Sequence, residues 1–230
     1  MMSIAATGAR PDRLVVAVSG ASGAVYAYRM LHMLSETTIE THLVMSKAAR
    51  RTLVYETGLA AEDLEMLADV VHPAGDIGAS IASGSFRTCG MVVVPCSIKT
   101  MSEIAYGIAG NLISRAADVT LKERRRLVLM VRETPLHAGH LRAMLAVTEM
   151  GGIIAPPVPA LYAKPESIED IVDHSVARVL DLFDIQVGHI RRWGEDLDLT
   201  PLATPTGPNN AGVESADALA ESTPASSRLR

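Results

Sequence analysis

The chain alternates short apolar runs with longer stretches in which apolar residues recur every three or four positions. The short runs predict buried β-strands, and they lie at Leu14–Val18, Thr41–Met45, Met91–Pro95, Arg126–Val131 and Gly152–Ala155. The helical spacing recurs at 22–34, 46–55, 101–116, 139–150 and 167–182. Strands that alternate with helices imply parallel pairing. The pattern therefore predicts the α/β class, as a three-layer sandwich around a mostly parallel sheet.

The two ends of the chain differ from this pattern. From about residue 196 the composition changes to Pro, Thr, Ser, Ala and Asn, which offer little apolar surface to bury. We therefore predict a flexible N-terminus at 1–12, one folded domain at 13–195 and a disordered tail at 196–230. A total of 230 residues suits one domain with a tail, and the scarcity of aromatic residues (3%) predicts an aliphatic core.

Charge and targeting signals narrow the partners. The net charge is −5, and the densest basic cluster, Lys122–Arg126, is too short to follow a nucleic-acid backbone, so we expect no nucleic-acid partner. The chain has no signal-peptide pattern and no apolar run long enough to span a membrane, which predicts a cytoplasmic protein. Cys89 and Cys96 would point to opposite faces of one strand, so we expect no disulfide between them.

Polar or flexible residues follow each predicted strand. These segments are Ser19–Gly23, Ser46–Lys47, Ser97–Thr100, Arg132–Glu133 and Pro156–Tyr162. In a parallel sheet, ligands bind beyond the carboxyl ends of the strands. The five segments therefore predict a polar pocket at that edge.

The turn after the first strand, Gly20-x-x-Gly23, favours a single phosphate. It lacks the G-x-G-x-x-G pattern of dinucleotide sites and the Gly-Lys-Ser/Thr ending of a P-loop. Ser22 can cap the following helix and donate to an anion at its N-terminus. A plain β–α turn without a ligand remains open. The segment Ser97–Thr100 repeats this arrangement, with ordinary helix capping as its alternative.

Other polar motifs have simpler interpretations. Arg132–Glu133 follows a buried strand directly, where the carboxylate could serve as an acid or base or as a salt-bridge partner. Ser167 and Asp170 resemble a capping box rather than a metal motif. His137 and His140 lack a third ligand at suitable spacing, so we expect no metal ion. Cys96 could have a lowered pKa at a helix start, although a packed thiol is the simpler role.

Long motifs in order resemble the UbiX-type flavin prenyltransferases. They are SGASGA (19–24), MSKAA (45–49), VYETGL (54–59), VVPCSIKTMSEIAYGIAGNLISRAADVTLKERR (93–125), RETPLHAGHLRAM (132–144) and PPVPALYAKPESIEDIVDHSVARVLDL (156–182). The resemblance covers residues 13–195 and departs from the family at Arg126, Leu161 and Lys164. It implies a Rossmann-like or flavodoxin-like sheet in a flavoprotein family of homo-oligomers that also includes cysteine decarboxylases.

The resemblance also implies a reaction. Reduced FMN would be bound as the prenyl acceptor, and its N5 and C6 would be joined to the dimethylallyl group of dimethylallyl monophosphate. The product, prenylated FMN, would serve a separate UbiD-type decarboxylase, in ubiquinone synthesis or in aromatic acid decarboxylation. The assembly implied by the family is a dodecamer with its sites at subunit contacts.

Residue roles are carried over by matching motif. The FMN-binding residues implied are Gly20, Ala21, Ser22, Ser46, Ser97, Ile98, Lys99, Thr100 and Arg132. The residues implied to hold the prenyl phosphate are Tyr162, Arg178, Lys122 and Arg115. Glu133 would relay protons to the leaving phosphate and from C6, and Glu56 would lie near the flavin edge. Ser22, Glu56 and Lys122 join Glu133 in the predicted catalytic set.

Two other functions remain open from the sequence. The first is an FMN-dependent decarboxylase of the cysteine or aromatic-acid type. Those relatives place a histidine in a helix before the later strand end, and the corresponding stretch, Ala79–Ser85, has none. The second is a non-catalytic FMN-carrying subunit of a decarboxylase.

Overall fold

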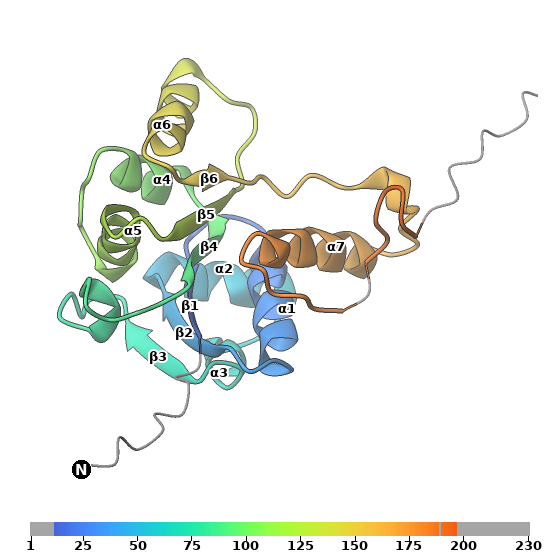
Figure 1. Cartoon of the computed structure of the whole chain (residues 1–230), viewed down its shortest axis with the longest axis horizontal. Helices are drawn as coiled ribbons and strands as arrows, with labels where there is room; N and C mark the ends of the chain where they lie inside the picture. The colour runs from blue at the N-terminus through green and yellow to red at the C-terminus, as the bar shows by residue number, and fades with distance from the viewer. Residues whose placement is uncertain (1–11, 189, 197–230) are drawn as a thin grey trace, which may run out of the picture. The chain divides into compact units, whose positions relative to one another are not determined.

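A six-stranded, wholly parallel sheet organises the part of the chain that the computed structural model describes, residues 12–188 and 190–196 (Figure 1). The strand order is β3-β2-β1-β4-β5-β6. The strands are β1 (Arg13–Val18), β2 (Glu40–Met45), β3 (Val70–Pro73), β4 (Gly90–Cys96), β5 (Arg126–Val131) and β6 (Ile153–Ile154). The predicted tail, 196–230, and the predicted N-terminal segment, 1–12, lie outside the described residues except for Asp12 and Asp196.

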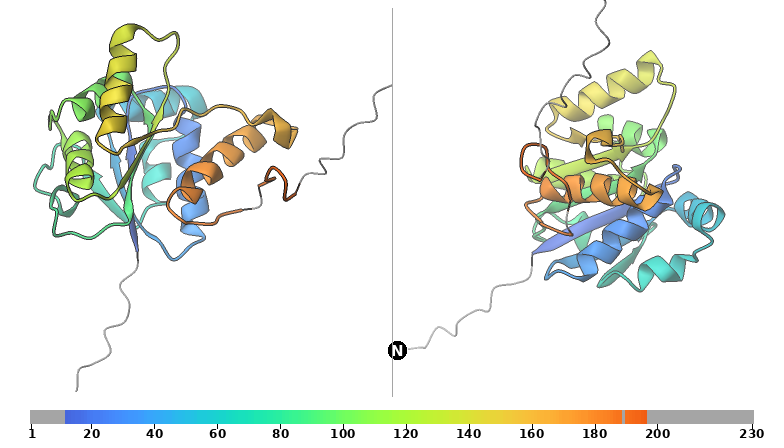
Figure 2. Two further views of the ribbon diagram at one scale, coloured as in Figure 1. Left: turned by 45° about the horizontal axis from the view of Figure 1, so that its top comes forward. Right: turned by 90° about the vertical axis from the view of Figure 1, so that its right-hand side faces the viewer.

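Helices cover both faces of this sheet (Figures 1 and 2). One face packs against α1 (Ala24–Ser35), α2 (Lys47–Thr57), α3 (Ala61–Glu65) and α7 (Ile168–Asp181). The other packs against α4 (Ile98–Ala105), α5 (Leu112–Lys122) and α6 (Ala138–Glu149). Along β1, Leu14 and Val16 face the first set while Val15 and Ala17 face the second. Because a strand exposes alternate residues to its two faces, a strand buried on both sides is apolar throughout. The predicted three-layer α/β sandwich is confirmed.

The order of the strands creates a topological switch point at the centre of the sheet, between β1 and β4. The chain builds β1, β2 and β3 outward in one direction and then returns to place β4 beside β1. Connections after β1 and β4 consequently leave the sheet toward opposite faces, to α1 and α4. Such a switch point is where open α/β sheets bind ligands.

The structure differs from the predicted elements in two places. The region between residues 57 and 86, where no element was predicted, contains α3, the edge strand β3 and a short 3-10 helix, η1 (Ser80–Ala82). The single helix predicted at 101–116 is two helices, α4 and α5. Gly107 lies between them with a φ of 66°, a conformation that ends a helix, and the side chain of Asn111 accepts from Ile113 and Ser114 to start α5.

None of the described helices combines the length and apolarity needed to cross a membrane.

Candidate functional site

The side chain of Ser19 ties the ends of the two central strands together. Its hydroxyl donates to the carbonyl of Pro95 (2.9 Å) and accepts from the N–H of Ser97 (2.7 Å). The residue is 1% exposed, so these bonds are shielded from water. The loops after β1 and β4 are therefore held side by side at the switch point.

Two helices start at this edge with serine caps. Ser46 accepts from the N–H of Ala49 (3.0 Å) at the start of α2, and Ser97 accepts from that of Thr100 (3.3 Å) at the start of α4. The hydroxyl of Ser97 also donates to the Thr100 hydroxyl (3.1 Å). The N–H groups of Ile98 and Lys99 belong to the first turn of α4, which has no intrahelical acceptors for them. Hydroxyls and first-turn N–H groups are a donor set that suits an anion.

The start of α1 holds a carboxylate from a distant helix. Oε2 of Glu56 accepts from the N–H groups of Gly23 (2.8 Å) and Ala24 (2.9 Å). The expectation that Ser22 caps this helix is wrong: the N-cap is Gly23, with no side-chain cap, and the Ser22 hydroxyl bonds to Glu56 instead. The anion at this helix N-terminus is thus a side chain of the protein itself.

This environment keeps Glu56 ionised. Burial raises the pKa of its carboxyl, but bonds from the Ser22 hydroxyl and two backbone N–H groups, with the charge of Arg132, lower it below the ordinary value. Arg132 also acts on Tyr26, whose pKa is raised by burial and only partly lowered by that arginine. Tyr26 had no motif in the sequence. Its position in the first turn of α1, beside Gly23, brings it to the site.

The loop after β1 packs closely on α2. A Cβ atom at Gly20 would collide with that of Ala48, so only glycine fits there. The N–H of Ala21 donates to the carbonyl of Ser19 (2.9 Å), which closes the turn. Ser22, at its tip, is exposed. The loop therefore presents its backbone and one hydroxyl outward.

The segment after β5 carries two exposed charges. The backbone N–H of Arg132 donates to the carbonyl of Cys96 (3.1 Å), which places it beside the α4 loop. Oε1 of Glu133 accepts from the N–H of Thr134 (3.0 Å), and the residue is exposed. The structure thus brings Ser22, Glu56 and Arg132 together and places Glu133 directly after them.

A hollow lies between β6 and α7. Its volume is about 280 Å³, and Tyr162 and Arg178 line it with Pro156, Pro157 and His174 among others. Glu56 lines a different hollow, of about 300 Å³, on the outer side of α2. Within one chain the predicted phosphate residues Tyr162 and Arg178 are therefore together but do not share a hollow with Glu56.

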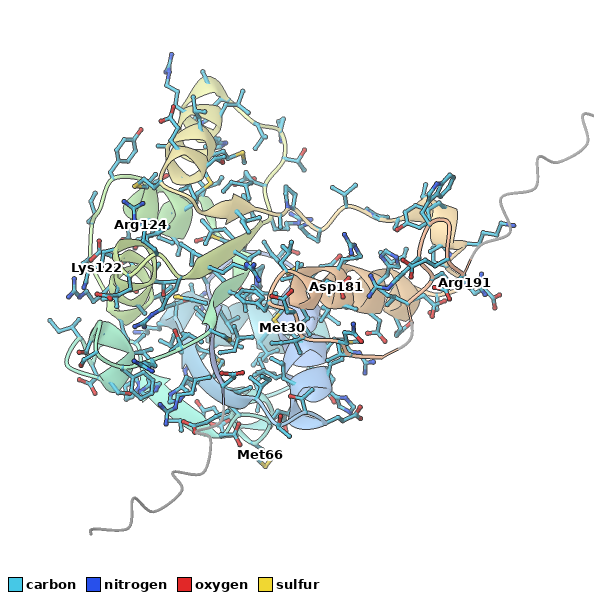
Figure 3. The ribbon with its side chains drawn as sticks, in the orientation of Figure 1. Met30, Met66, Lys122, Arg124, Asp181 and Arg191 are labelled. Carbon is cyan, nitrogen blue, oxygen red and sulfur yellow. The ribbon has the colours of Figure 1, made fainter. Side chains whose placement is uncertain are left out.

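Arg115 and Lys122 lie on the other side of the sheet. Both belong to α5, whose apolar face packs on the sheet face opposite to that of α7. Figure 3 shows Lys122 on α5 and Asp181 at the end of α7, well separated. Arg115 pairs with Asp118 (2.7 Å) and Lys122 with Glu123. The structure does not bring these two cations to Tyr162 and Arg178 within one chain.

The remaining motifs have structural roles. Ser167 and Asp170 form the predicted capping box at the start of α7. Burial raises the pKa of the Cys96 thiol well above its usual range, in agreement with a packed thiol. His137 caps α6 by accepting from the N–H of Gly139 (3.0 Å). Among residues 12–188 and 190–196, no three His, Cys, Asp or Glu side chains are grouped as metal ligands would be.

Known proteins resemble this chain over most of its length. The sequence profile of the Flavoprotein family matches residues 3–180. Flavin prenyltransferase UbiX of Escherichia coli (strain K12) is 58% identical over 184 residues, which cover 79% of this chain and 97% of that protein. The corresponding protein of Thauera aromatica is 55% identical over 181 residues, covering 79% of this chain and 93% of the relative.

Solved structures agree with this likeness. The crystal structure of AnUbiX (PadA1) in complex with FMN and dimethylallyl pyrophosphate is 54% identical and superposes with a TM-score of 0.79, covering 80% of this chain and 98% of that one. A dodecameric FMN-dependent UbiX-like decarboxylase from Escherichia coli O157:H7 is 50% identical, with a TM-score of 0.77 over 79% of this chain and 98% of that one.

Proposed function

We propose, since the chain belongs to the UbiX family of flavin prenyltransferases, that it joins the dimethylallyl group of dimethylallyl monophosphate to N5 and C6 of reduced FMN. The protein is accordingly an enzyme that transfers a prenyl group to a flavin. Its product would be prenylated FMN, released to a decarboxylase of the UbiD type.

The observation that carries the proposal is the pairing of the loops after β1 and β4 at the switch point. It combines the donor set of α4 with the Ser22, Glu56 and Arg132 cluster. Because Glu56 occupies the N-terminus of α1, we assign the FMN phosphate to Ser46, Ser97–Thr100 and the first turn of α4. Gly20, Ala21 and Ser22 would then lie along the flavin ring, with Arg132 at its side. This replaces the expectation that the first glycine turn holds the phosphate.

The chain's own residues would control charge and protons. When bound, reduced FMN would supply two nucleophilic atoms: N5 for C1 of the donor, whose bond to the phosphate oxygen would break with its electron pair on phosphate, and C6 for C3, whose double bond to C2 would open as C2 takes up a proton. The protons lost from N5 and C6 would balance those gained by C2 and phosphate. Arg178 and the hydroxyl of Tyr162 would stabilise the leaving phosphate. Glu133, exposed beside Arg132, would take the proton lost from C6 and pass a proton to phosphate. Glu56, kept ionised, would hold Ser22 in place at the ring edge.

The position of Arg115 and Lys122 supports an assembly in which copies of the chain share sites. These residues lie on α5, which covers the sheet face opposite to that of α7, so an approach of α5 of one copy to α7 of another would bring them to Tyr162 and Arg178. The relative from E. coli O157:H7 is dodecameric. We propose a homo-oligomer, with a dodecamer as the expected state, whose prenyl-phosphate site is completed by a neighbouring subunit.

The direct test is the mass of the flavin after reaction. Purified protein is incubated without oxygen with reduced FMN and dimethylallyl monophosphate, and the extracted flavin should be heavier by one dimethylallyl unit. A parallel reaction with dimethylallyl pyrophosphate, the compound in the AnUbiX complex, decides the donor preference. Glu133→Gln should bind FMN normally and form little product. A flavin of unchanged mass in the wild-type reaction would contradict the proposal.

The same preparation separates the alternatives. A decarboxylase would release CO₂ from a cysteine peptide or an aromatic acid with no change in flavin mass. A carrier subunit would retain FMN and catalyse neither reaction. For the client, the product extract should activate a UbiD-type apo-decarboxylase, and extracts from Glu133→Gln should not.

A further inference from the structure

One carboxylate near the hollow that Tyr162 and Arg178 line is shared by two arginines. Asp181, at the end of α7, accepts at Oδ2 from Nη1 of Arg178 (2.7 Å) and from Nη1 of Arg192 (2.8 Å). Arg192 adds a second bond, from Nη2 to Oδ1 (2.9 Å), and so grips both oxygens. The pKa of Asp181 is lowered by Arg192 first and, against the effect of burial, by Arg178. Asp181 is therefore a fixed negative charge at neutral pH.

The sharing changes the charge that Arg178 offers to a ligand. A lone Arg178–Asp181 pair would be neutral, whereas the three side chains in direct contact, two guanidinium groups and one carboxylate, carry one net positive charge. Two further carboxylates, Glu195 and Asp196, act on Arg192 from its other neighbours, and Asp196 accepts from the backbone N–H of Arg192 (2.9 Å). Arg178 lines the hollow with Tyr162, whereas Asp181 and Arg192 are not among its lining residues. Arg178 is therefore the member of the cluster that an anion in the hollow would meet.

The segment that carries Arg192 also holds Tyr162. The ring of Trp193 packs edge-on against the Tyr162 ring, with centroids 5.5 Å apart and an interplanar angle of 89°. Arg191, labelled in Figure 3, donates to the carbonyl of Ala163 (3.2 Å), the residue that follows Tyr162 in the chain. Residues 191–193 therefore contact the surroundings of Tyr162 and Arg178, two of the four residues predicted to hold the prenyl phosphate.

We propose that Arg192 is a positioning residue for the prenyl donor, which engages Asp181 so that Arg178 keeps a positive charge for the donor's phosphate. The proposal rests on the proposed function, because that function places the phosphate at Arg178. Arg192 itself does not line the hollow and would not touch the substrate.

The test compares charge removal with charge restoration. Arg192→Gln leaves the cluster neutral, and we expect the KM for dimethylallyl monophosphate to rise about fivefold, the scale of one exposed ion-pair contribution, with little change in kcat or FMN affinity. The double variant Asp181→Asn/Arg192→Gln regains the excess positive charge on Arg178. Its KM should return toward the wild-type value. Arg192→Lys, which keeps the charge but loses the two-pronged grip, should lie close to wild type.

A matched control is Arg126→Gln. Arg126 is another exposed arginine paired with an aspartate, Asp184 (3.3 Å), but it lies at the start of β5, at the amino end of the strand. The substitution removes the same charge as Arg192→Gln and should leave the KM for dimethylallyl monophosphate unchanged. Thermal unfolding of each variant verifies that the fold is retained.

A binding measurement gives a readout besides activity. Calorimetric titration of inorganic phosphate into the FMN-loaded protein should show weaker binding in Arg192→Gln and recovery in the double variant. An unchanged KM and phosphate affinity in Arg192→Gln, or a double variant no better than the single one, would overturn the charge-sharing proposal. If wild-type protein makes no prenylated flavin, the proposed function fails, while the phosphate titration still tests Arg192.

Discussion

Glu56 does for α1 what serine side chains do for α2 and α4, but from a separate helix. Its carboxylate accepts from the N–H groups of the N-cap residue Gly23 and of Ala24, the first residue of α1, and faces the positive end of that helix. Ser46 and Ser97 cap their own helices from the preceding residue. The contact from Glu56 therefore stabilises α1 and at the same time fixes the position of α2 relative to it.

The first prediction concerns Glu56→Gln. Its loss of charge at the start of α1 should lower the free energy of unfolding by about 0.5–1 kcal/mol at neutral pH. The folded-state pKa of Glu56 lies below its ordinary value of 4.5, so the stability it adds is complete above pH 4.5 and disappears as the pH falls through the folded pKa. Urea unfolding between pH 7 and 3 should show the difference between wild type and variant narrowing below pH 4.5.

The control for this prediction is Glu149→Gln, at the exposed C-terminal end of α6. Removing a negative charge there does not weaken a helix, so no loss of stability is expected. A difference between wild type and Glu56→Gln that stays constant down to pH 3 would contradict the assigned role of the carboxylate.

What the sequence could reveal about single residues depended on distance along the chain. The caps at Ser97 and Ser167 were predictable because a cap bonds an N–H only two or three positions ahead. Glu56 lies 33 positions from Gly23, and no local pattern reports such a bond. The Ser22 cap was predicted from local chemistry alone. In the structure, the N–H groups at the start of α1 donate to the distant carboxylate of Glu56.

At the scale of elements, the β1–α1 turn approaches α2 closely at Gly20 and Ala48. Gly20→Ala would place a methyl group against the Cβ of Ala48, and overpacking of this kind costs about 1–3 kcal/mol. The variant should therefore be less stable to urea. Gly75→Ala, where a Cβ meets nothing within 4 Å, is the matched control.

A compensating change distinguishes collision from a general loss of glycine. Ala48→Gly creates the missing space, at a cost of about 1 kcal/mol for glycine in a helix. Gly20→Ala/Ala48→Gly should consequently be more stable than the sum of the two single effects predicts. Strictly additive effects would show that the two residues do not compete for the same space.

The elements missed from the sequence share a physical reason. The central strands are buried on both faces, which makes them continuous apolar runs. The edge strand β3 is four residues long, alternates between half-buried and exposed positions, and contains His72 and Pro73, so it resembles a loop. The break between α4 and α5 was hidden because Ile104, Ile108 and Leu112 continue the helical spacing across it.

The whole molecule presents its predicted phosphate-binding cations on two opposite sides. Arg178 lies on α7, which covers one face of the sheet, and Lys122 lies on α5, which covers the other. The sequence motifs predicted both residues as one set, since a motif carries no information about the chain on which its partner resides. The three-dimensional arrangement supports the proposal that the set is assembled from more than one copy.

The prediction at this scale is complementation between inactive variants. Lys122→Ala and Arg178→Ala should each abolish most prenyl transfer. If every site takes Lys122 from one subunit and Arg178 from another, co-expressed variants that mix at random should recover about one quarter of wild-type activity, because a quarter of sites receive both intact residues. Sites confined to one chain would recover none, which the flavin mass assay would detect.

The buried hydroxyl of Ser19 has a consequence for the timing of local opening. The hydroxyl bonds to both Pro95 and Ser97. The loops after β1 and β4 therefore cannot separate from each other without breaking these shielded bonds. In native-state hydrogen exchange, the amide of Ser97 should therefore exchange as slowly as the amides inside β1, and the two loops should open as one cooperative unit. Ser19→Ala should uncouple them, so that one buried side chain governs how often the two loops separate.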